Sequence, residues 1–237
     1  MKLVLVRHGR PDEENVERPH DPPLRADGWA QARAVAALLA LEGITRIVSS
    51  PLQRARDTAE PLAATLKLPI HTIDGWAEAD RHVARYRSTE TLRALGDEEW
   101  GRFLQDPVRY LGDDPQRFRA AVLAALAETV GAAQREEHVA VFTHGLPINL
   151  VLSHVLGLER IVHFKIGYGS VTRLRVHRTG TLGVVSVNES GHHALRPPNV
   201  TPADCGPVPD TGAGAAREGG ESATQFQVTP AHAGVHP

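Results

Sequence analysis

Residues 3–9 read Leu-Val-Leu-Val-Arg-His-Gly, and residues 139–145 read Val-Ala-Val-Phe-Thr-His-Gly. Each stretch is a short apolar run that ends in His-Gly and leads into a helical pattern. Runs this short and this apolar are typical of the buried strands of an α/β sheet. Ligands of open parallel sheets bind just outside the carboxyl ends of the strands. If the two strands are neighbours, His8 and His144 therefore face each other across one pocket.

A single histidine after a strand is usually a loop residue with a satisfied hydrogen bond. Two features favour a functional interpretation here. The apolar run that ends in His-Gly occurs twice, and Arg7 places a cation beside the imidazole of His8. We therefore predict a two-histidine reaction centre, with a glycine after each histidine so that the backbone can approach a ligand closely.

The rest of the chain alternates between strand and helix patterns and ends in a hairpin. Strands are expected at 44–49, 69–72 and 138–143, helices at 27–41, 52–66, 115–133 and 147–157, and the hairpin at 171–176 and 182–187. This alternation predicts an α/β fold, a three-layer α/β/α sandwich with a mostly parallel central sheet.

Local signals refine this prediction. Asp27 is expected to cap the first helix and Gly43 to end it. Pro61 should bend or split the second helix, and the strand at 69–72 should lie at a sheet edge. Residues 73–113 form the least regular part, with short helical patterns around 90–105.

The composition excludes several classes of protein. The 237 residues are 41% hydrophobic and 23% charged, with a net charge of −2, so nothing in bulk favours a nucleic-acid or membrane partner. No apolar stretch approaches the roughly 20 residues that span a bilayer. The start of the chain lacks a signal-peptide pattern, so we expect a cytoplasmic protein. The single cysteine, Cys205, excludes an internal disulfide and a cysteine-pair metal site.

The end of the chain differs in composition from the rest. Residues 197–237 contain seven prolines and six glycines in 41 residues, a proportion typical of low-complexity sequence. We therefore predict a folded domain over residues 1–196 and a disordered, non-catalytic tail over 197–237.

Four segments resemble the signatures of the histidine phosphatase superfamily, which is also called phosphoglycerate mutase-like. Residues 5–9 are similar to its Arg-His-Gly signature, and residues 24–32 to its Leu-Thr-x-x-Gly-x-x-Gln-Ala helix start. Residues 49–59 match its Ser-Ser-Pro-x-x-Arg-Ala-x-x-Thr-Ala segment, and residues 143–145 match its late histidine motif. All four lie in family order within residues 3–176, in the phosphatase branch of the family.

The resemblance implies that His8 is a nucleophile that forms a phosphohistidine, and that Arg7, Arg54 and His144 bind the phosphoryl group. His144 is also counted with the catalytic residues. The residue types agree with these roles, because arginine can hold two oxygens of a phosphoryl group at once. Nearby arginines should keep His8 neutral, and a backbone carbonyl should hold its other ring nitrogen.

The leaving alcohol needs a proton donor, and the resemblance implies a glutamate shortly after the third strand. We assign Glu78 in Trp76-Ala77-Glu78, with Asp80 as its rival and a surface glutamate as the structural alternative. The same residue would activate the hydrolytic water. This chemistry needs no metal and no cofactor.

Two further positions stay open in the sequence. Many family members carry a phosphate-binding asparagine six residues after the nucleophile, where this chain has Glu14. Asn15 would take that role if the loop is one residue longer. The adjacent pair His192-His193 remains unassigned.

These residues favour a histidine acid phosphatase-type phosphomonoesterase that acts on a small phosphorylated metabolite. The first alternative is a phosphoglycerate mutase-type phosphoryl transferase, which needs longer segments to close its site than residues 73–113 provide. The second is a non-catalytic phosphate-binding module, which would have lost at least one residue of the centre. Sugar phosphates, nucleotide-related phosphates and the ribazole phosphate of cobalamin assembly all remain possible substrates.

Overall fold

The computed structural model describes residues 1–133 and 136–194, so the predicted tail at 197–237 lies outside the described residues. The strands are β1 (Lys2–Arg7), β2 (Arg46–Ser49), β3 (Ile70–Thr72), β4 (His138–Thr143), β5 (Val171–Val176) and β6 (Leu182–Glu189). The α-helices are α1 (Ala26–Leu39), α2 (Gln53–Leu66), α3 (Thr89–Ala94), α4 (Asp97–Gln105), α5 (Pro107–Tyr110), α6 (Pro115–Gly131) and α7 (Gly145–Leu156). Short 3-10 helices cover Ala40–Glu42, Asp74–Trp76 and Gly191–Ala194.

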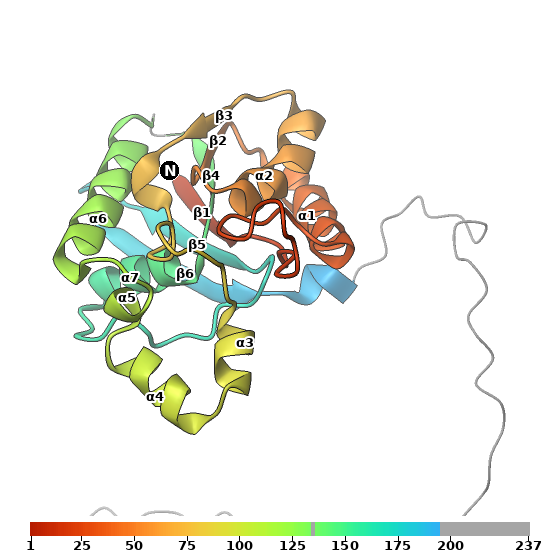
Figure 1. Ribbon diagram of the computed structural model, residues 1–237. Helices are drawn as coiled ribbons and strands as arrows, with labels where there is room; N and C mark the ends of the chain where they lie inside the picture. Colours follow the sequence, from red (N-terminus) through yellow and green to blue (C-terminus); the bar gives the residue numbers. More distant parts are fainter. Residues whose placement is uncertain (134–135, 195–237) are drawn as a thin grey trace, which may run out of the picture. The chain divides into compact units, whose positions relative to one another are not determined.

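The six strands form one sheet in the order β3-β2-β4-β1-β5-β6 (Figure 1). The four strands from β3 to β1 are parallel, whereas β5 runs antiparallel to both of its neighbours. The predicted α/β fold with a mostly parallel sheet is confirmed. Strands β1 and β4 are adjacent, with Arg7 opposite Thr143, so the two His-Gly segments leave the sheet side by side.

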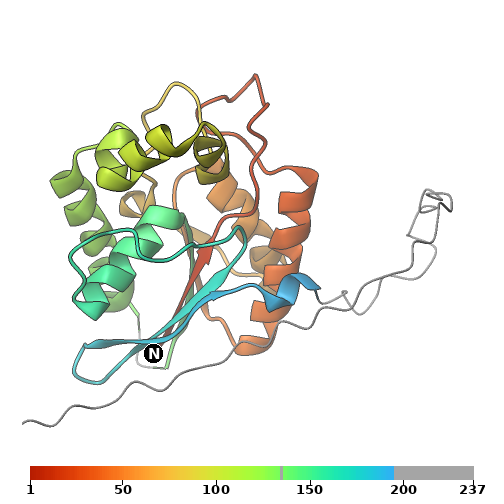
Figure 2. The same cartoon turned by 90° about the horizontal axis from the view of Figure 1, so that it is seen from below.

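The central strands β1 and β4 are buried on both faces of the sheet, because residues 3–6 and 139–142 are all apolar. Leu3 and Leu5 of β1 belong to a core cluster that includes residues of α6 and α7. Val4 and Val6, on the opposite face, belong to a cluster that includes residues of α1 and α2. Figure 2 shows the resulting three layers, with the sheet between these two pairs of helices.

Most of the local predictions are confirmed. Gly43 takes a left-handed conformation with φ 66° and ends the first helical segment, as a glycine after a helix does. Strand β3 lies at a sheet edge, and β5 and β6 form the predicted antiparallel hairpin. Pro147 lies in the first turn of α7.

One local prediction is wrong. The cap of α1 is Arg25, and Asp27 lies inside the first turn, where its Oδ1 accepts the Gly28 N–H at 3.0 Å. The helix begins earlier than expected, so Asp27 does not cap it, and its negative charge interacts favourably with the helix dipole. Helix α2 continues through Pro61 without being split, because proline removes only one hydrogen bond of the helical ladder. The alternative effect of Pro61, a bend in this helix, stays a prediction.

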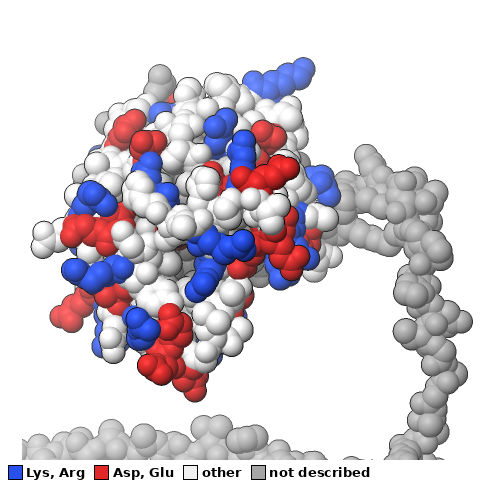
Figure 3. All heavy atoms as spheres, viewed as in Figure 1, with Lys and Arg blue, Asp and Glu red and all other residues white. Residues whose placement is uncertain are grey.

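The irregular region 73–113 supplies the cover over one end of the sheet. Helices α3, α4 and α5 follow one another there and lie across the end of the layers in Figure 2. Gly96, with φ 113°, makes the turn between α3 and α4. No helix among residues 1–133 and 136–194 is long and apolar enough to cross a bilayer. On the face drawn in Figure 3, cationic and anionic side chains are interspersed.

Candidate active site

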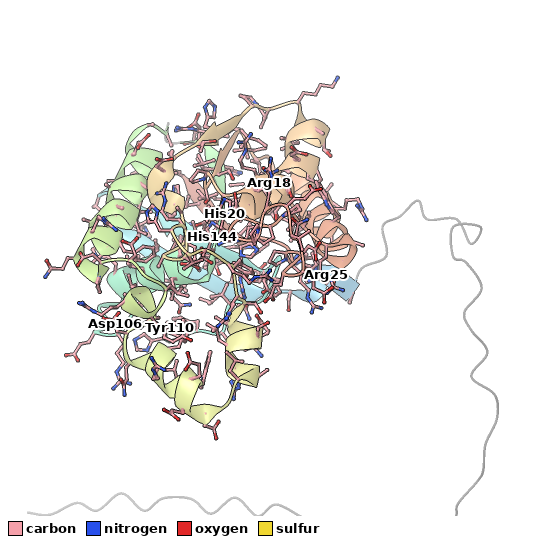
Figure 4. All side chains as sticks on the ribbon, viewed as in Figure 1. Arg18, His20, Arg25, Asp106, Tyr110 and His144 are labelled. Atoms are coloured by element: carbon pink, nitrogen blue, oxygen red, sulfur yellow. The ribbon has the colours of Figure 1, made fainter. Side chains whose placement is uncertain are left out.

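The two predicted histidines meet at the carboxyl ends of β1 and β4. Their ring centroids are 5.0 Å apart, with the rings inclined by 57°. Both side chains are buried, at 2% and 0% exposure for His8 and His144. Figure 4 places His144 in the same part of the view as Arg18 and His20 of the loop between β1 and α1. The two histidines of the predicted centre therefore lie side by side in the folded protein.

His8 is held in one tautomer. Its Nδ1 lies 2.8 Å from the carbonyl oxygen of Gly9, and a carbonyl can only accept, so Nδ1 carries the proton and Nε2 has a free lone pair. Burial lowers the pKa of His8 well below its usual value, and the charges of Arg54 and Arg7 lower it further. The expected backbone hydrogen bond and neutral imidazole are both confirmed.

The two glycines after the histidines have different roles. A Cβ on Gly9 would lie 2.5 Å from the carbonyl oxygen of Gly28, so this glycine permits close packing of two backbone segments. A Cβ on Gly145 would meet only Arg7 Nε and Glu78 Oε2, each at 3.9 Å. The prediction of a glycine that opens the backbone to a ligand therefore fits Gly145, whereas at Gly9 it is wrong.

Arg7 lies at the end of β1 and is 5% exposed. Its Nη1 donates to the carbonyl of Ile166, and its guanidinium lies 4.0 Å from the centre of the Tyr168 ring. Within the described part of the chain its buried Nε has no hydrogen-bond partner. A buried N–H without an acceptor is costly, so this atom is free to bind an anion.

Arg54 lies in the first turn of α2 and is fully buried. Its Nη2 donates to both carboxylate oxygens of Asp80, at 2.7 and 3.0 Å. Its guanidinium lies 4.5 Å from the ring centre of Tyr86, and Asp21 lies 3.6 Å from Nη1. Nε and Nη1 have no hydrogen-bond partner among the described residues, so two further donors are available in the centre.

His144 supplies a fourth buried nitrogen. Its Nε2 lies 2.7 Å from Ser50 Oγ, which itself accepts the N–H of Leu52 at 3.2 Å. The hydroxyl oxygen keeps a second lone pair, so it can donate to Nε2 or accept from it. When the hydroxyl donates, the imidazole proton lies on Nδ1 and this nitrogen is a donor. This Nδ1 is buried and has no partner among residues 1–133 and 136–194. Burial lowers the pKa of His144, and Arg54 and His8 add to this effect.

Glu78 is buried beside the N-terminus of α7. Its Oε2 accepts the N–H of Leu146 at 3.1 Å, and its Oε1 accepts the N–H of Ala79 at 3.0 Å. Burial raises its pKa to about 7 and Asp80 adds to the rise, although the two backbone hydrogen bonds oppose it. A carboxyl group with this pKa can both give and take a proton near neutral pH.

The structure distinguishes the two acidic candidates. Asp80 is held against Arg54 by a buried ion pair, in which both of its carboxylate oxygens accept from the guanidinium, so its negative charge is neutralised. Glu78 borders the space beside Gly145 and Arg7, and it is the carboxyl group with the raised pKa. This geometry favours Glu78 over Asp80 as the proton donor.

Asn15 is not brought to this centre by any contact that the described residues show. Its Oδ1 accepts the N–H of Arg18 at 2.8 Å, in a turn of the loop between β1 and α1. Its role as a phosphate ligand stays a prediction. The pair His192-His193 also lies outside the centre: Nε2 of each ring contacts a backbone carbonyl, of Gly169 and Tyr168 respectively.

Four residues of the site carried no signal that distinguished them beforehand. Tyr168 covers Arg7 and Tyr86 covers Arg54, and the two hydroxyl oxygens are 3.4 Å apart. Asp21 accepts the N–H of Gln53 and thereby caps α2 from another loop. Ser50 belongs to the segment at 49–59, which marked it as part of a motif without indicating its contact with His144.

A cavity of about 240 Å³ opens beside the histidines. Arg7 and Glu78 line it together with residues of α3, α4 and the segment 162–166. No group of three or more metal-binding side chains occurs in the part of the chain that the structure describes. The arrangement therefore consists of a neutral imidazole, four unpaired buried nitrogens, and a protonatable carboxyl at the mouth of a cavity.

The fold and this centre define a class of α/β protein that can bind an anionic group against a histidine. A family model described as the histidine phosphatase superfamily (branch 1) matches residues 3–189. The chain belongs to this superfamily.

Two curated relatives carry the name probable phosphoglycerate mutase GpmB. That of Salmonella paratyphi A is 32% identical over 165 residues, which cover 67% of this chain and 76% of the relative. That of Proteus mirabilis is 33% identical over 166 residues with the same coverage.

Two solved structures are similar in fold. A phosphoserine phosphatase from Entamoeba histolytica, in complex with 3-phosphoglyceric acid, has 26% sequence identity and a TM-score of 0.63, over 81% of this chain and 98% of that chain. A mycobacterial glucosyl-3-phosphoglycerate phosphatase has 24% identity and a TM-score of 0.67, over 80% and 99%. At this identity the second likeness concerns the fold alone.

Proposed function

We propose that this protein is a phosphomonoesterase that acts through a phosphohistidine intermediate on a small phosphorylated metabolite. One observation carries the proposal: buried nitrogens that have no hydrogen-bond partner among the described residues belong to side chains around His8, whose Nε2 has a free lone pair. These nitrogens are Arg7 Nε, Arg54 Nε, Arg54 Nη1 and His144 Nδ1. A phosphoryl group would satisfy them and would bring its oxygens to the positions where charge must be stabilised in transfer.

In the first step, His8 Nε2 attacks phosphorus and the bond from phosphorus to the ester oxygen breaks. The leaving alkoxide takes the proton of Glu78, so a neutral alcohol departs and Glu78 becomes a carboxylate. The hydrogen bond from Nδ1 to Gly9 stabilises the positive charge that develops on the ring. Arg7 and Arg54 balance the charge of the phosphoryl oxygens.

In the second step, the Glu78 carboxylate takes a proton from a water molecule that attacks the phosphohistidine. The bond between phosphorus and Nε2 breaks, inorganic phosphate forms, and His8 and Glu78 return to their starting protonation states. One carboxyl group thus serves as acid and then as base, which its pKa of about 7 suits.

The competing function is a phosphoglycerate mutase-type phosphoryl transfer, which the names of the curated relatives favour. A mutase must keep water away from the phosphohistidine while the intermediate turns. The cover formed by α3 to α5 is short, and its cavity stays open to solvent at exposed residues such as Arg93 and Lys165. This openness supports hydrolysis. A non-catalytic module is disfavoured because His8, Glu78 and the donors are all present.

The deciding experiment compares two reactions of the full chain. We expect phosphate release from a good monoester such as p-nitrophenyl phosphate to exceed 2-phosphoglycerate formation from 3-phosphoglycerate with catalytic 2,3-bisphosphoglycerate. Isomer formation much faster than any phosphate release would make the protein a mutase. The absence of both reactions would favour the binding module.

Two other predictions belong to this proposal. The residues of the centre lie between Arg7 and Tyr168, which supports a catalytic domain within residues 1–196. Glu14 and Asn15 lie in the loop that reaches α3 through Glu13, whose carboxylate accepts the Ser88 N–H at 3.2 Å. We retain Asn15, on this loop, as a proposed phosphate ligand. A cytoplasmic protein with no metal or cofactor remains our expectation.

A further inference from the structure

Most of the surface of the cavity beside the histidines is apolar, and seven of its sixteen lining residues have large apolar side chains. These seven are Trp100, Phe103, Leu111, Leu146, Val162, Phe164 and Ile166. Trp100 and Phe103 stack with their ring centroids 5.2 Å apart, and Phe103 packs edge-on against Tyr110 at 5.7 Å. The aromatic wall is therefore built from side chains that hold one another in place.

The position of the cavity relates it to the leaving group, and this step rests on the proposed function. Glu78 and Arg7 line the cavity, while His8 and Arg54 do not. If the phosphoryl group binds between His8 and Arg54, the ester oxygen faces Glu78. The carbon skeleton of the alcohol then extends past Glu78 into the cavity.

The size and lining of the cavity indicate the kind of alcohol that fits. Its volume of about 240 Å³ is several times the roughly 30 Å³ that one water occupies in the liquid. A three-carbon acid would leave most of the apolar lining in contact with water. A ring-bearing alcohol would remove that surface from water, which is favourable by about 25 cal/mol per Å².

Charged side chains of both signs also line the cavity. Glu90, Arg93 and Lys165 are all exposed at the cavity, and Arg93 lies over the face of Trp100 at 5.4 Å. Glu90 lines the same cavity as Arg7. Burial alone would raise the pKa of Glu90, but Arg7 and hydrogen bonds lower it overall. Glu90 is therefore an anion that lines the same cavity as Arg7.

We infer that the cavity selects phosphate monoesters of bulky, predominantly apolar alcohols, and that Glu90 disfavours esters with a carboxylate within a few atoms of the ester oxygen. The apolar wall binds the alcohol, and Glu90 repels a second anion that would otherwise compete for Arg7. Glu90 is thus a specificity-determining residue. The inferred substrate differs from the phosphoglycerates that the names of relatives contain.

The test uses three alkyl esters, so that leaving-group acidity is similar throughout. They are 2-phenylethyl phosphate, glycerol 3-phosphate and 3-phosphoglycerate. We expect kcat/KM for the phenylethyl ester to exceed that for glycerol 3-phosphate by about tenfold or more, the scale of discrimination an apolar pocket gives. We expect glycerol 3-phosphate, which has a hydroxymethyl group in place of the carboxylate, to exceed 3-phosphoglycerate by about fivefold, the scale of repulsion between like charges about 4 Å apart in water.

Two variants assign the selectivity to residues. Glu90→Gln should raise the ratio of kcat/KM for 3-phosphoglycerate over glycerol 3-phosphate about fivefold. Glu98→Gln, the matched control on the exposed side of α4, should leave that ratio unchanged. Leu111→Asn should reduce the preference for the phenylethyl ester, with glycerol 3-phosphate hydrolysis as the internal measure of an intact fold.

The outcomes separate this inference from the proposed function. If the protein hydrolyses phosphomonoesters but prefers 3-phosphoglycerate, or if Glu90→Gln leaves the ratio unchanged, the inference is overturned and the hydrolase stands. If no phosphomonoester is hydrolysed, including p-nitrophenyl phosphate, the proposed function fails and the inference fails with it.

Discussion

Asp80 accepts two hydrogen bonds from one nitrogen of Arg54, at 2.7 and 3.0 Å, inside a region where both side chains are buried. Removing one partner of a buried ion pair leaves an uncompensated charge. The same carboxylate is the main charged group that raises the pKa of Glu78. Asp80 thus links the position of a phosphate-site arginine to the acidity of the proposed proton donor.

This link predicts the effect of Asp80→Asn on the pH dependence of hydrolysis. Loss of the Asp80 charge and exposure of Glu78 to an unneutralised Arg54 both lower the pKa of Glu78. The alkaline limb of kcat/KM for an alkyl phosphate, expected near pH 7 in the wild type, should therefore move to lower pH. Stability should fall by about 3 kcal/mol. Asp74→Asn, at a carboxylate that is 78% exposed, serves as control. An alkaline limb that stays in place in Asp80→Asn would contradict the effect of Asp80 on the pKa of Glu78.

Glu78→Gln should distinguish substrates by their leaving groups. Glutamine cannot donate the proton that an alkoxide needs, so kcat/KM for an alkyl phosphate should fall about 100-fold or more. The loss for p-nitrophenyl phosphate should stay below about tenfold, because nitrophenolate leaves without protonation. Steady-state kinetics on both substrates measure the difference. Equal losses would indicate a structural role for Glu78.

His8→Ala should abolish turnover, because no other group offers a free nitrogen at the same point. A loss of about 10⁴-fold corresponds to roughly 5.5 kcal/mol in the barrier. Rapid quenching of the wild type with labelled substrate should trap an acid-labile, base-stable phosphoenzyme, which the variant lacks. His154→Ala, at an exposed histidine of α7, should behave as the wild type. A trapped phosphoenzyme in His8→Ala would refute the assignment.

The buried histidines predict that the protein loses stability in acid. The pKa values of His8 and His144 lie below the ordinary 6.5 in the folded state, so the unfolded state binds more protons once the pH falls below about 6.5. The free energy of unfolding should then decrease by up to about 1.4 kcal/mol per pH unit for each histidine.

Glu78 opposes this trend, so the measurement is best made in the Glu78→Gln background. Its folded pKa of about 7 is above the ordinary 4.5, and the stability it contributes in acid is lost as the pH rises through 7. In that background, denaturant unfolding between pH 5 and 7 should show a shallower pH slope after His144→Gln. The exposed His154→Gln should leave the slope unchanged. An unaltered slope in His144→Gln would mean that folding does not lower the pKa of this histidine.

Alanine substitutions at the two glycines after the histidines should differ in their effect on stability. Gly9→Ala places a methyl group 2.5 Å from the Gly28 carbonyl and should lower stability by about 2 kcal/mol. Gly145→Ala has 3.9 Å of clearance, so its stability should stay within about 1 kcal/mol. Its methyl group would enter the space between Arg7 and Glu78 and raise KM. Thermal unfolding and kinetics on both variants check this, and a stable Gly9→Ala would contradict the packing argument.

Much of the fold and part of the site could be predicted from local sequence patterns. The two apolar runs ending in His-Gly indicated two buried strands, and the structure makes them neighbours, with Arg7 opposite Thr143, so that their histidines lie together. The segment at 49–59 indicated Arg54 at a helix start. Such features depend on periodicity and turn chemistry within about ten residues, which a single sequence contains.

Other properties of the site were decided only by the tertiary structure. Nothing near Arg54 in the sequence indicates that Asp80 and Tyr86 hold it, or that Tyr168 covers Arg7. The choice between Glu78 and Asp80 depends on which carboxylate an arginine neutralises and which one burial leaves unpaired. By itself the sequence determined the strands, the helices and the histidine–arginine chemistry, because these follow from local patterns of residue type. Hydrogen-bond partners, pKa values and the shape of the cavity required the fold, because they arise from burial and charge contributed by segments that lie far apart along the chain.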